Sequence, residues 1–292
     1  MSVYKHNYRA YTGKLTPGWA RIFVLARYGY QDAWSSKITV GIFILCLLPC
    51  LVFLFAIYLA NNPMARLLLG NHAPRILAIN AEFFLNLLYA QFGPALVLAA
   101  WIAPRLITFE LADDALPILL SHPISRFGYV FGKWIALFTA LSLVTWIPDL
   151  VLFAYQGYSS PQPWAAANLP IAIGLLAGAM IWIAFLSLLG LALSSWVKWR
   201  VVATGVIFAA ILVPAGVGSI VSAVLRTKWG LLLNLPLMIS ILWQRFMGVP
   251  GFANSQEASL PTAAISAMLM LVCLLFLAML FARIRAREVV RG

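Results

Sequence analysis

Long runs of apolar residues alternate with short charged segments along this 292-residue chain. A transmembrane helix needs about 20 predominantly apolar residues to cross the hydrocarbon core of a bilayer. Six runs reach that length, and they cover residues 38–60, 83–104, 134–155, 169–197, 201–225 and 260–282. Five of them contain no charged residue, and one is interrupted only by Asp149. The pattern predicts an all-α integral membrane protein with a six-span domain over residues 38–282.

The segment before the first apolar run is polar and basic. Residues 1–37 carry six lysines and arginines, and from Trp19 onward the apolar residues recur with helical spacing. Two faces result, one with Trp19, Ile22, Phe23, Ala26 and Tyr30, and the other with Arg21, Tyr28, Asp32 and Ser35. An amphipathic helix with a cationic polar face typically lies in the plane of the membrane interface. The sequence therefore predicts an interfacial helix over residues 18–36.

A shorter apolar run, residues 229–244, lies before the last predicted span. It has 16 residues between Lys228 and Arg245, and Pro236 falls inside it. This length is too short for a regular transmembrane helix, and proline interrupts helical hydrogen bonding. We therefore predict a re-entrant or interfacial segment here rather than a seventh span.

The distribution of Lys and Arg selects the orientation of the spans. With six spans and a cytoplasmic N-terminus, fifteen Lys and Arg residues fall in cytoplasmic segments and five in outer segments. Cytoplasmic loops of membrane proteins carry an excess of these residues. Both terminal segments, 1–37 and the basic tail 283–292, are therefore predicted to be cytoplasmic. Arg126 and Lys133 are expected to anchor the third span at the inner headgroups.

Composition agrees with this assignment and removes one class of partner. The chain is 63% hydrophobic and only 10% charged, whereas about a quarter of the residues in a soluble domain are charged. Its net charge is +12. The basic cytoplasmic segments of a membrane protein account for this excess, so we predict no nucleic-acid partner.

Motifs for ATP hydrolysis and for metal or nucleophilic catalysis are missing. The sequence contains no G-x-x-x-x-G-K-[ST] phosphate-binding loop and no H-E-x-x-H zinc motif. Its three histidines lie outside the predicted spans, and its three cysteines lie in apolar runs, where they fit a packed core. We therefore predict no catalytic residue, metal site or cofactor in this chain.

One ionisable residue falls well inside a predicted span. Asp149 follows Pro148 in the third span and precedes Tyr155 by six residues. An intramembrane carboxylate is costly and commonly marks a transport pathway or a contact with a partner. The alternative is a carboxylate near the outer end of the span that reaches water or a hydroxyl. The sequence does not decide between these two interpretations.

Small residues in the fourth span predict close helix packing. Gly174 and Gly178 form a G-x-x-x-G pattern. Small residues at this spacing let the backbones of two helices approach closely. We predict packing within one subunit rather than a dimer interface.

The long charged stretch between two apolar runs is 105–133, which joins the second and third predicted spans. Glu110, Asp113 and Asp114 are spaced i, i+3 and i+4, so a helix would place them on one face. Apolar residues and a turn at Pro123 follow. An acidic and partly apolar helix of this kind fits a docking element, although a solvated loop would show the same spacing.

The residues of this stretch form a more specific pattern. Leu119-Leu120-Ser121-x-Pro123-Ile124-Ser125-Arg126 is followed by Gly132-Lys133, and Glu110 precedes it. The pattern resembles the cytoplasmic loop between the second and third spans of ABC-2 type transporter permeases. In that family the loop carries a short coupling helix that contacts the ATPase subunit. The family often has Gly-Thr before the leucines, where this chain has Asp114-Ala115.

The resemblance implies a transport subunit of an ATP-driven ABC transporter, which has no enzymatic activity of its own. It implies two copies of an ABC ATPase subunit that hold ATP and Mg²⁺, a second permease subunit, identical or homologous, and a lipid environment in a bacterial cytoplasmic (inner) membrane. The residues implied to couple the permease to the ATPase are Glu110, Asp113, Asp114, Leu119, Pro123 and Arg126. Export is implied, of a lipidic, amphipathic or glycan-type substrate.

Two other classes of membrane protein stay open. An ion-coupled secondary transporter would use several ionisable groups within its spans, and here only Asp149 is available. A membrane-embedded enzyme would need a nucleophile and a base at membrane depth, and the sequence shows no such pair.

Overall fold

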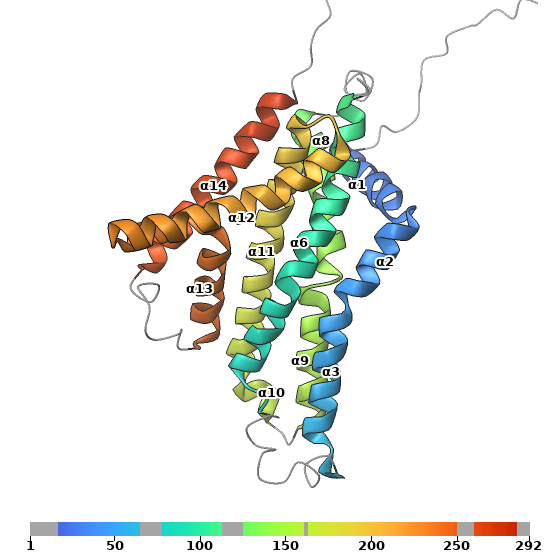
Figure 1. The fold of residues 1–292 in the computed structure, drawn as a ribbon. Helices are drawn as coiled ribbons and strands as arrows, with labels where there is room; N and C mark the ends of the chain where they lie inside the picture. Colours follow the sequence, from blue (N-terminus) through green and yellow to red (C-terminus); the bar gives the residue numbers. More distant parts are fainter. Residues whose placement is uncertain (1–16, 65–77, 113–124, 161–162, 250–259, 285–292) are drawn as a thin grey trace, which may run out of the picture.

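The computed structural model describes residues 17–64, 78–112, 125–160, 163–249 and 260–284, and every regular element within these ranges is helical (Figure 1). In chain order the helices are α1 (Gly18–Trp34), α2 (Lys37–Cys46), α3 (Leu48–Asn61), α6 (Ala81–Ala112), α8 (Arg126–Ser142), α9 (Trp146–Ser159), α10 (Trp164–Ala167), α11 (Leu169–Trp196), α12 (Arg200–Leu225), the 3₁₀ helix η2 (Lys228–Leu233), α13 (Leu235–Met247) and α14 (Thr262–Arg283).

Six helical segments of the described chain are long and apolar enough to cross a membrane. They are Lys37–Asn61, Ala81–Thr108, Arg126–Ser159, Leu169–Trp196, Arg200–Leu225 and Thr262–Arg283. Each contains most of one apolar run found in the sequence, because the free energy of moving a side chain into lipid depends mainly on its own chemistry. The prediction of an all-α integral membrane protein with six spans is confirmed.

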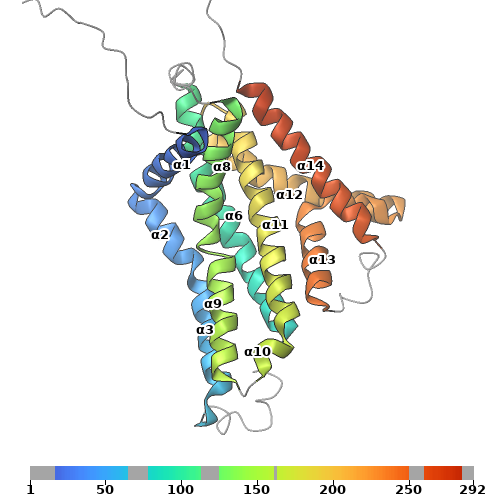
Figure 2. The ribbon, with the colours of Figure 1, turned by 180° about the vertical axis from the view of Figure 1, so that it is seen from behind.

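The spans form a bundle around α11, which packs against α6, α8, α9, α12, α13 and α14. We call the end that carries α1, the start of α8 and the ends of α6 and α14 the upper end, and the opposite end, with α10 and the end of α3, the lower end (Figures 1 and 2). α12 starts at the upper end and crosses the bundle obliquely.

Prolines interrupt two of the spans. The first span bends between α2 and α3, just before Pro49, and the third breaks between α8 and α9, just before Pro148. A proline ring clashes with the carbonyl four residues earlier and supplies no N–H for it. At the second break Thr145 donates to the Leu141 carbonyl at 2.9 Å, which compensates part of the lost bonding. α6 continues through Pro94 as one helix.

The predicted N-terminal helix forms, but its apolar residues are divided between two surroundings. Ala26 of α1 is buried, and the helix packs mainly against α8. Trp19 and Phe23, predicted to share the same face, are 66% and 58% exposed. Only this exposed part is free to enter the interfacial region of a membrane. The sequence predicted one apolar face that lies in the membrane interface. This prediction is wrong in one respect, because half of that face is covered by protein.

Residues 229–244 do not form a seventh span within the described structure. η2 folds back along the last turns of α12, where a Cβ at Gly218 would lie 2.8 Å from the Gly230 carbonyl oxygen. α13 then runs beside α11 toward the lower end. A 3₁₀ turn followed by a 13-residue helix thus forms this part of the chain. Its re-entrant or interfacial position in a membrane stays a prediction.

The G-x-x-x-G pattern packs within the subunit, as predicted. A Cβ at Gly174 would lie 2.7 Å from the Phe246 carbonyl oxygen, and one at Gly178 would lie 2.7 Å from Cδ1 of Trp243. Both contacts are made to α13 of the same chain, and the Trp243 indole also donates to the Gly178 carbonyl at 2.9 Å. These two glycines therefore hold the short α13 helix against the central helix of the bundle.

Candidate functional site

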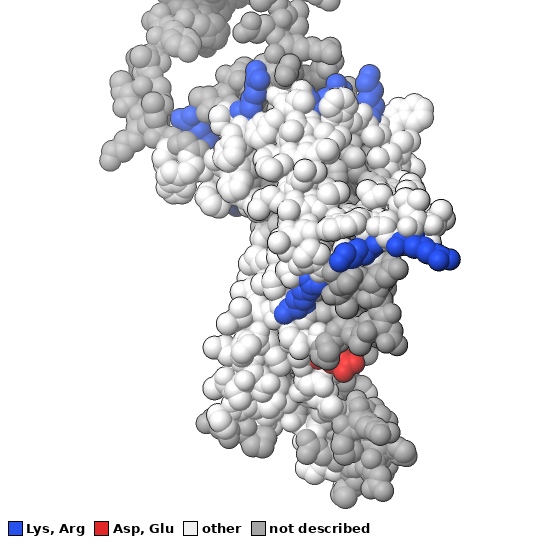
Figure 3. Space-filling view, turned by 90° about the vertical axis from the view of Figure 1, so that its left-hand side faces the viewer, with Lys and Arg blue, Asp and Glu red and all other residues white. Residues whose placement is uncertain are grey.

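Basic side chains mark the upper end of the bundle. Figure 3 shows one face of the molecule, on which Lys and Arg gather at the upper end and in a smaller group lower down, while the rest of the described surface is almost uncharged. Arg126 starts α8, Lys198 lies between α11 and α12, and Arg283 ends α14. α6, which precedes residues 113–124, therefore ends at the basic end of the bundle, and α8, which follows them, begins there.

A mostly buried ion pair joins α6 to α8 at this end. Lys133 Nζ donates to Glu110 Oε1 at 2.5 Å, and the Tyr129 hydroxyl donates to Glu110 Oε2, also at 2.5 Å. The Lys133 side chain is 5% exposed and the Glu110 side chain 27%. Tyr129 and Lys133 are four residues apart and so share one face of α8. Ser125 caps the helix by accepting from the Gly128 N–H at 3.0 Å.

This pair gives Glu110 a different setting from the acidic face predicted for it. Glu110 lies on α6, and both of its carboxylate oxygens are bonded to α8. Asp113, Asp114, Leu119 and Pro123 lie outside the described residues. Arg126, at the start of α8, is exposed, as a docking role requires. In the structure the Glu110 side chain therefore turns inward, whereas the Arg126 side chain turns outward.

One further expectation for 105–133 is corrected, and both ends of the stretch are helical. Helix α6 continues to Ala112 and α8 begins at Arg126, and residues 113–124 between them lie outside the described ranges. Lys133 was expected to anchor the third span at the headgroups, and this is wrong, because its ammonium group is buried against Glu110. The ion pair with the mostly buried Glu110 carboxylate outweighs the preference of the Lys133 side chain for the membrane interface.

Arg105 also belongs to the helix rather than to a loop. It donates to the Thr39 hydroxyl at 3.5 Å and to the Asp32 carbonyl at 3.4 Å. The Trp101 indole donates to the same hydroxyl at 3.2 Å, and the Arg200 guanidinium stacks on the Trp101 ring at 4.1 Å. These contacts hold the junction of α1 and α2 against α6 and the start of α12.

Asp149 makes a contact between helices in the middle of the bundle. It is completely buried in the first turn of α9, and Gln91 Nε2 of α6 donates to its Oδ1 at 2.6 Å. The same amide group donates to Cys50 Sγ of α3 at 3.1 Å. The interpretation in which Asp149 reaches water or a hydroxyl near the end of the span is therefore wrong. A role in a transport pathway stays a prediction.

Two helix interruptions lie close to this contact, one between α2 and α3 and the other before α9. Cys46 Sγ, in the last turn of α2, donates to the Pro94 carbonyl of α6 at 3.2 Å. The break before α9 ends at Thr145, four residues before Asp149. The Asp149 and Gln91 side chains each keep one buried oxygen without a hydrogen-bond partner in the described structure. Two interrupted spans and the continuous helix α6 therefore meet at a polar contact that is only partly satisfied.

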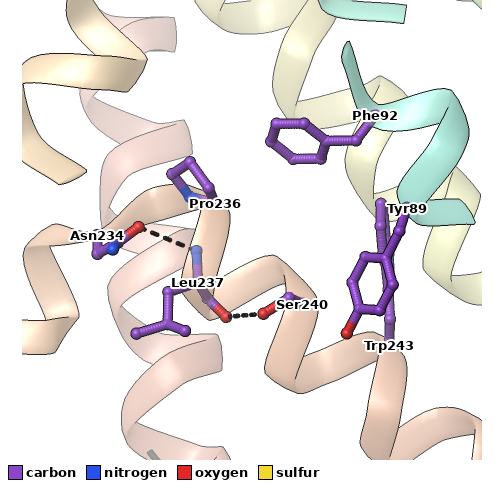
Figure 4. Close-up of a pocket in the computed structure, with 7 residues that line it drawn as sticks. All are labelled: Tyr89, Phe92, Asn234, Pro236, Leu237, Ser240 and Trp243. Atoms are coloured by element: carbon purple, nitrogen blue, oxygen red, sulfur yellow. Dashed lines mark hydrogen bonds between the residues drawn. The ribbon is translucent and has the colours of Figure 1, made fainter. Parts of the chain in front are cut away.

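An open cavity of about 360 Å³ lies between α6 and α13 (Figure 4). Its lining consists of Tyr89, Phe92, Asn234, Pro236, Leu237, Ser240 and Trp243. Asn234 Oδ1 accepts from the Leu237 N–H at 3.0 Å, Ser240 donates to the Leu237 carbonyl at 2.8 Å, and Tyr89 accepts from Gln244 at 2.8 Å. No charged side chain is among the lining residues. Such a site fits an uncharged apolar or aromatic group.

Sequence reasoning missed Gln91, Tyr129 and the role of Lys133. Gln91 was detectable as a polar residue within a charge-free run, and Tyr129 and Lys133 as a pair with i, i+4 spacing. Neither signal identifies the residue on another helix to which these side chains bond. The described residues hold no group of three or more His, Cys, Asp or Glu side chains placed to bind a metal ion.

Comparison with known families gives a match that covers most of the chain. A family model described as "ABC-2 family transporter protein" matches residues 66–289. The matched region contains five of the six spans and the whole of 105–133. No curated protein matches the chain.

Proposed function

This chain belongs to the ABC-2 family of transporter proteins, and we propose that it is the permease subunit of an ATP-driven exporter whose ATPase is a separate chain. The family match over residues 66–289 carries this proposal. As a permease, the chain supplies the membrane pathway, while the ATPase partner binds ATP and Mg²⁺. Isolating the protein from its native membrane tests this directly, because a co-purifying ABC ATPase is the expected result.

The segment between α6 and α8 is the proposed ATPase contact. Asp113, Asp114, Leu119 and Pro123 lie in it, and exposed Arg126 begins the helix that follows. Acidic and apolar side chains fit a groove on the partner with basic and apolar residues. Support comes from the resemblance of this stretch to family coupling loops and from the basic end of the bundle, at which α6 ends and α8 begins.

Reversing the charges of Asp113 and Asp114 to lysine is expected to release the ATPase while the permease still inserts and folds. Removing one partner of a desolvated charge contact typically costs about 2–5 kcal/mol, a loss of affinity of about thirtyfold or more. Co-purification of the ATPase with the Asp113→Lys, Asp114→Lys variant measures the effect. Glu110 is left unchanged, because its reversal would place a second ammonium group beside Lys133.

The control for this experiment is Glu82→Lys. Glu82 is an exposed carboxylate in the first turn of α6, at the lower end, so its reversal is expected to leave the ATPase bound. ATPase binding that is unchanged in the double variant would show that Asp113 and Asp114 belong to a solvated loop.

Two permease subunits and two ATPase subunits make up the proposed transporter. The exposed face of α12 is apolar along its length, with Val201, Leu212, Val213, Ile220 and Val224 all more than half exposed. Contiguous apolar surface of this kind is covered by lipid or by another protein in a membrane. A second permease copy, identical or homologous, would cover part of it.

The proposed substrate is lipidic or amphipathic, with a glycan-type substrate as the polar alternative. The uncharged cavity between α6 and α13 supports an apolar group as part of the substrate. Export is proposed because the family resemblance implies it. Mass spectrometry of lipids retained by the purified transporter, compared with those retained by a Phe92→Trp variant that fills the cavity, tests the substrate class. Identical retained species in both would argue against a role for the cavity.

Both termini and residues 105–133 are proposed to be cytoplasmic, in a bacterial inner membrane. In intact cells, a membrane-impermeant thiol reagent is expected to label Tyr158→Cys, at the lower end, and to leave Ser125→Cys unlabelled. Tyr158 is 90% exposed, Cys46 and Cys50 of the native chain are buried, and the partly exposed Cys273 is replaced by serine in both variants. Labelling of Ser125→Cys from outside would reverse the orientation.

A further inference from the structure

The ion pair of Glu110 and Lys133 joins the two helices that flank the proposed ATPase contact. Glu110 lies two residues before the end of α6, and Lys133 lies in the second turn of α8. Between these helix ends lies the segment 113–124. A force applied to that segment therefore reaches both helices just where the ion pair ties them together.

We propose that Glu110, Tyr129 and Lys133 are positioning residues that make the upper ends of α6 and α8 move as one body when the ATPase moves. This inference rests on the proposed function. None of the three residues need touch the ATPase. Their role is to stop the two helix ends from separating or rotating independently, so that displacement of 113–124 reaches the spans.

The contact has the properties of a rigid link rather than a surface ion pair. Exposed ion pairs contribute little, because water screens them and their side chains must be ordered. Here the Lys133 side chain is 5% exposed and the Tyr129 residue 1%. Tyr129 occupies the second carboxylate oxygen, so Glu110 is held at both oxygens. Additional hydrogen bonds are what a mostly buried pair needs to offset the cost of desolvation.

Helix α1 packs against the same link. A Cβ at Gly29 of α1 would lie 3.2 Å from Leu106 and 4.0 Å from Cδ of Lys133. On α8, a Cβ at Gly132 would lie 3.2 Å from the Ile22 carbonyl oxygen. Glycines at these crossings let the three helices approach closely. The rigid body proposed here therefore comprises α1 and the upper ends of α6 and α8.

The test uses the complete transporter with its ATPase, reconstituted in proteoliposomes, and a reporter at the far end of the bundle. The reporter is Tyr158→Cys in a Cys273→Ser background, labelled with a fluorescent maleimide. Trapping nucleotide with Mg-ATP and vanadate is expected to change the labelling rate, since movement at the upper end reaches the lower end. This readout needs no identified substrate.

The informative variant is Glu110→Gln, Lys133→Gln. Two amides keep neutral hydrogen bonding and strand no charge, so the variant is expected to fold and to bind the ATPase. Its nucleotide-dependent change in labelling rate is expected to fall about tenfold, the low end of what close charge pairs contribute. Tyr129→Phe, which removes one hydrogen bond and keeps the ring, is expected to show a smaller fall and serves where the double variant fails to assemble.

Thr108→Val is the matched control. Thr108 is buried on α6, half a turn before Glu110, and donates to the Ser194 carbonyl of α11 at 3.1 Å. Its removal loosens α6 without touching the link to α8, so the labelling response is expected to persist.

The outcomes separate this inference from the proposed function. A full response in both the Gln–Gln variant and Tyr129→Phe overturns the positioning role alone, as does an equal loss in Thr108→Val. A parent protein that binds no ATPase, or shows no response to trapped nucleotide, overturns the proposed function and this inference with it.

Discussion

Replacing Gln91 by leucine is expected to destabilise the protein by about 3 kcal/mol, because the change removes the hydrogen-bond donor of a completely buried carboxyl group. The Gln91 amide donates to Asp149 Oδ1 at 2.6 Å, and the second oxygen of Asp149 has no partner in the described structure. Without the Gln91 donor, neither oxygen of the buried Asp149 carboxyl group has a hydrogen-bond partner among the described residues to offset its desolvation. Thermal unfolding of the purified protein in detergent measures the effect.

A double-mutant cycle gives this prediction its control. Asp149→Asn keeps an acceptor of nearly the same size and is expected to cost about 1 kcal/mol or less. Gln91→Leu combined with Asp149→Leu is expected to recover much of the stability lost in Gln91→Leu, because replacing both partners by apolar groups can be nearly neutral. Strictly additive losses in the two leucine variants would show that the contact is not a coupled pair.

Asp149→Asn also bears on the ion-coupled alternative. A transporter driven by an ion gradient would need the ionisable group itself, whereas a contact between helices needs only its shape and its acceptor. Under the proposed function, we therefore expect the asparagine variant to retain ATP-driven transport activity. Loss of activity with stability preserved would favour a pathway role for Asp149.

Adding side chains at Gly174 and Gly178 is expected to displace α13 from α11. At Gly174 the obstacle is backbone, since a Cβ there would lie 2.7 Å from the Phe246 carbonyl oxygen and 3.0 Å from its carbon. At Gly178 it is the buried ring of Trp243. Overpacking of this kind costs about 1–3 kcal/mol at one site. The Gly174→Ala, Gly178→Ala double variant is expected to lose more than either single variant in thermal unfolding.

Gly205→Ala is the matched control for these glycines. Gly205 lies within α12, and no atom would come within 4 Å of a Cβ there. Alanine in a helix interior is favoured over glycine by about 0.5–1 kcal/mol, so this variant is expected to be as stable as the parent or slightly more so. A similar loss at Gly205 would mean that any added methyl group destabilises the protein and that the α11–α13 contact is not special.

Displacing α13 has a functional consequence as well. Trp243 of α13 packs against Tyr89 and Phe92 of α6, and these three rings line the open cavity together with Ser240 (Figure 4). The cavity exists only while α13 is held at this distance from α6. Under the proposed function, the alanine pair is therefore expected to change which lipids the purified transporter retains, while ATPase binding at the upper end is unaffected.

Much of the architecture could be predicted from the sequence, because the preference of a side chain for lipid or water is largely its own property. The six spans, the helix over α1 and the close packing of Gly174 and Gly178 within the subunit all follow from local composition and spacing. The count of six also excluded residues 229–244 as a span, since its length alone is insufficient.

The partners of the polar residues were decided only by the tertiary structure. Glu110 and Lys133 are 23 residues apart, and Gln91 and Asp149 are 58 apart, on different helices. Whether two such side chains meet depends on how each helix is rotated about its axis and how deep it lies, which packing against α11 and its neighbours sets. Local spacing placed Glu110 on an acidic face with Asp113. In the structure the Glu110 carboxylate instead faces α8, where it pairs with Lys133. Glycine contacts with α1 hold this lysine close to it.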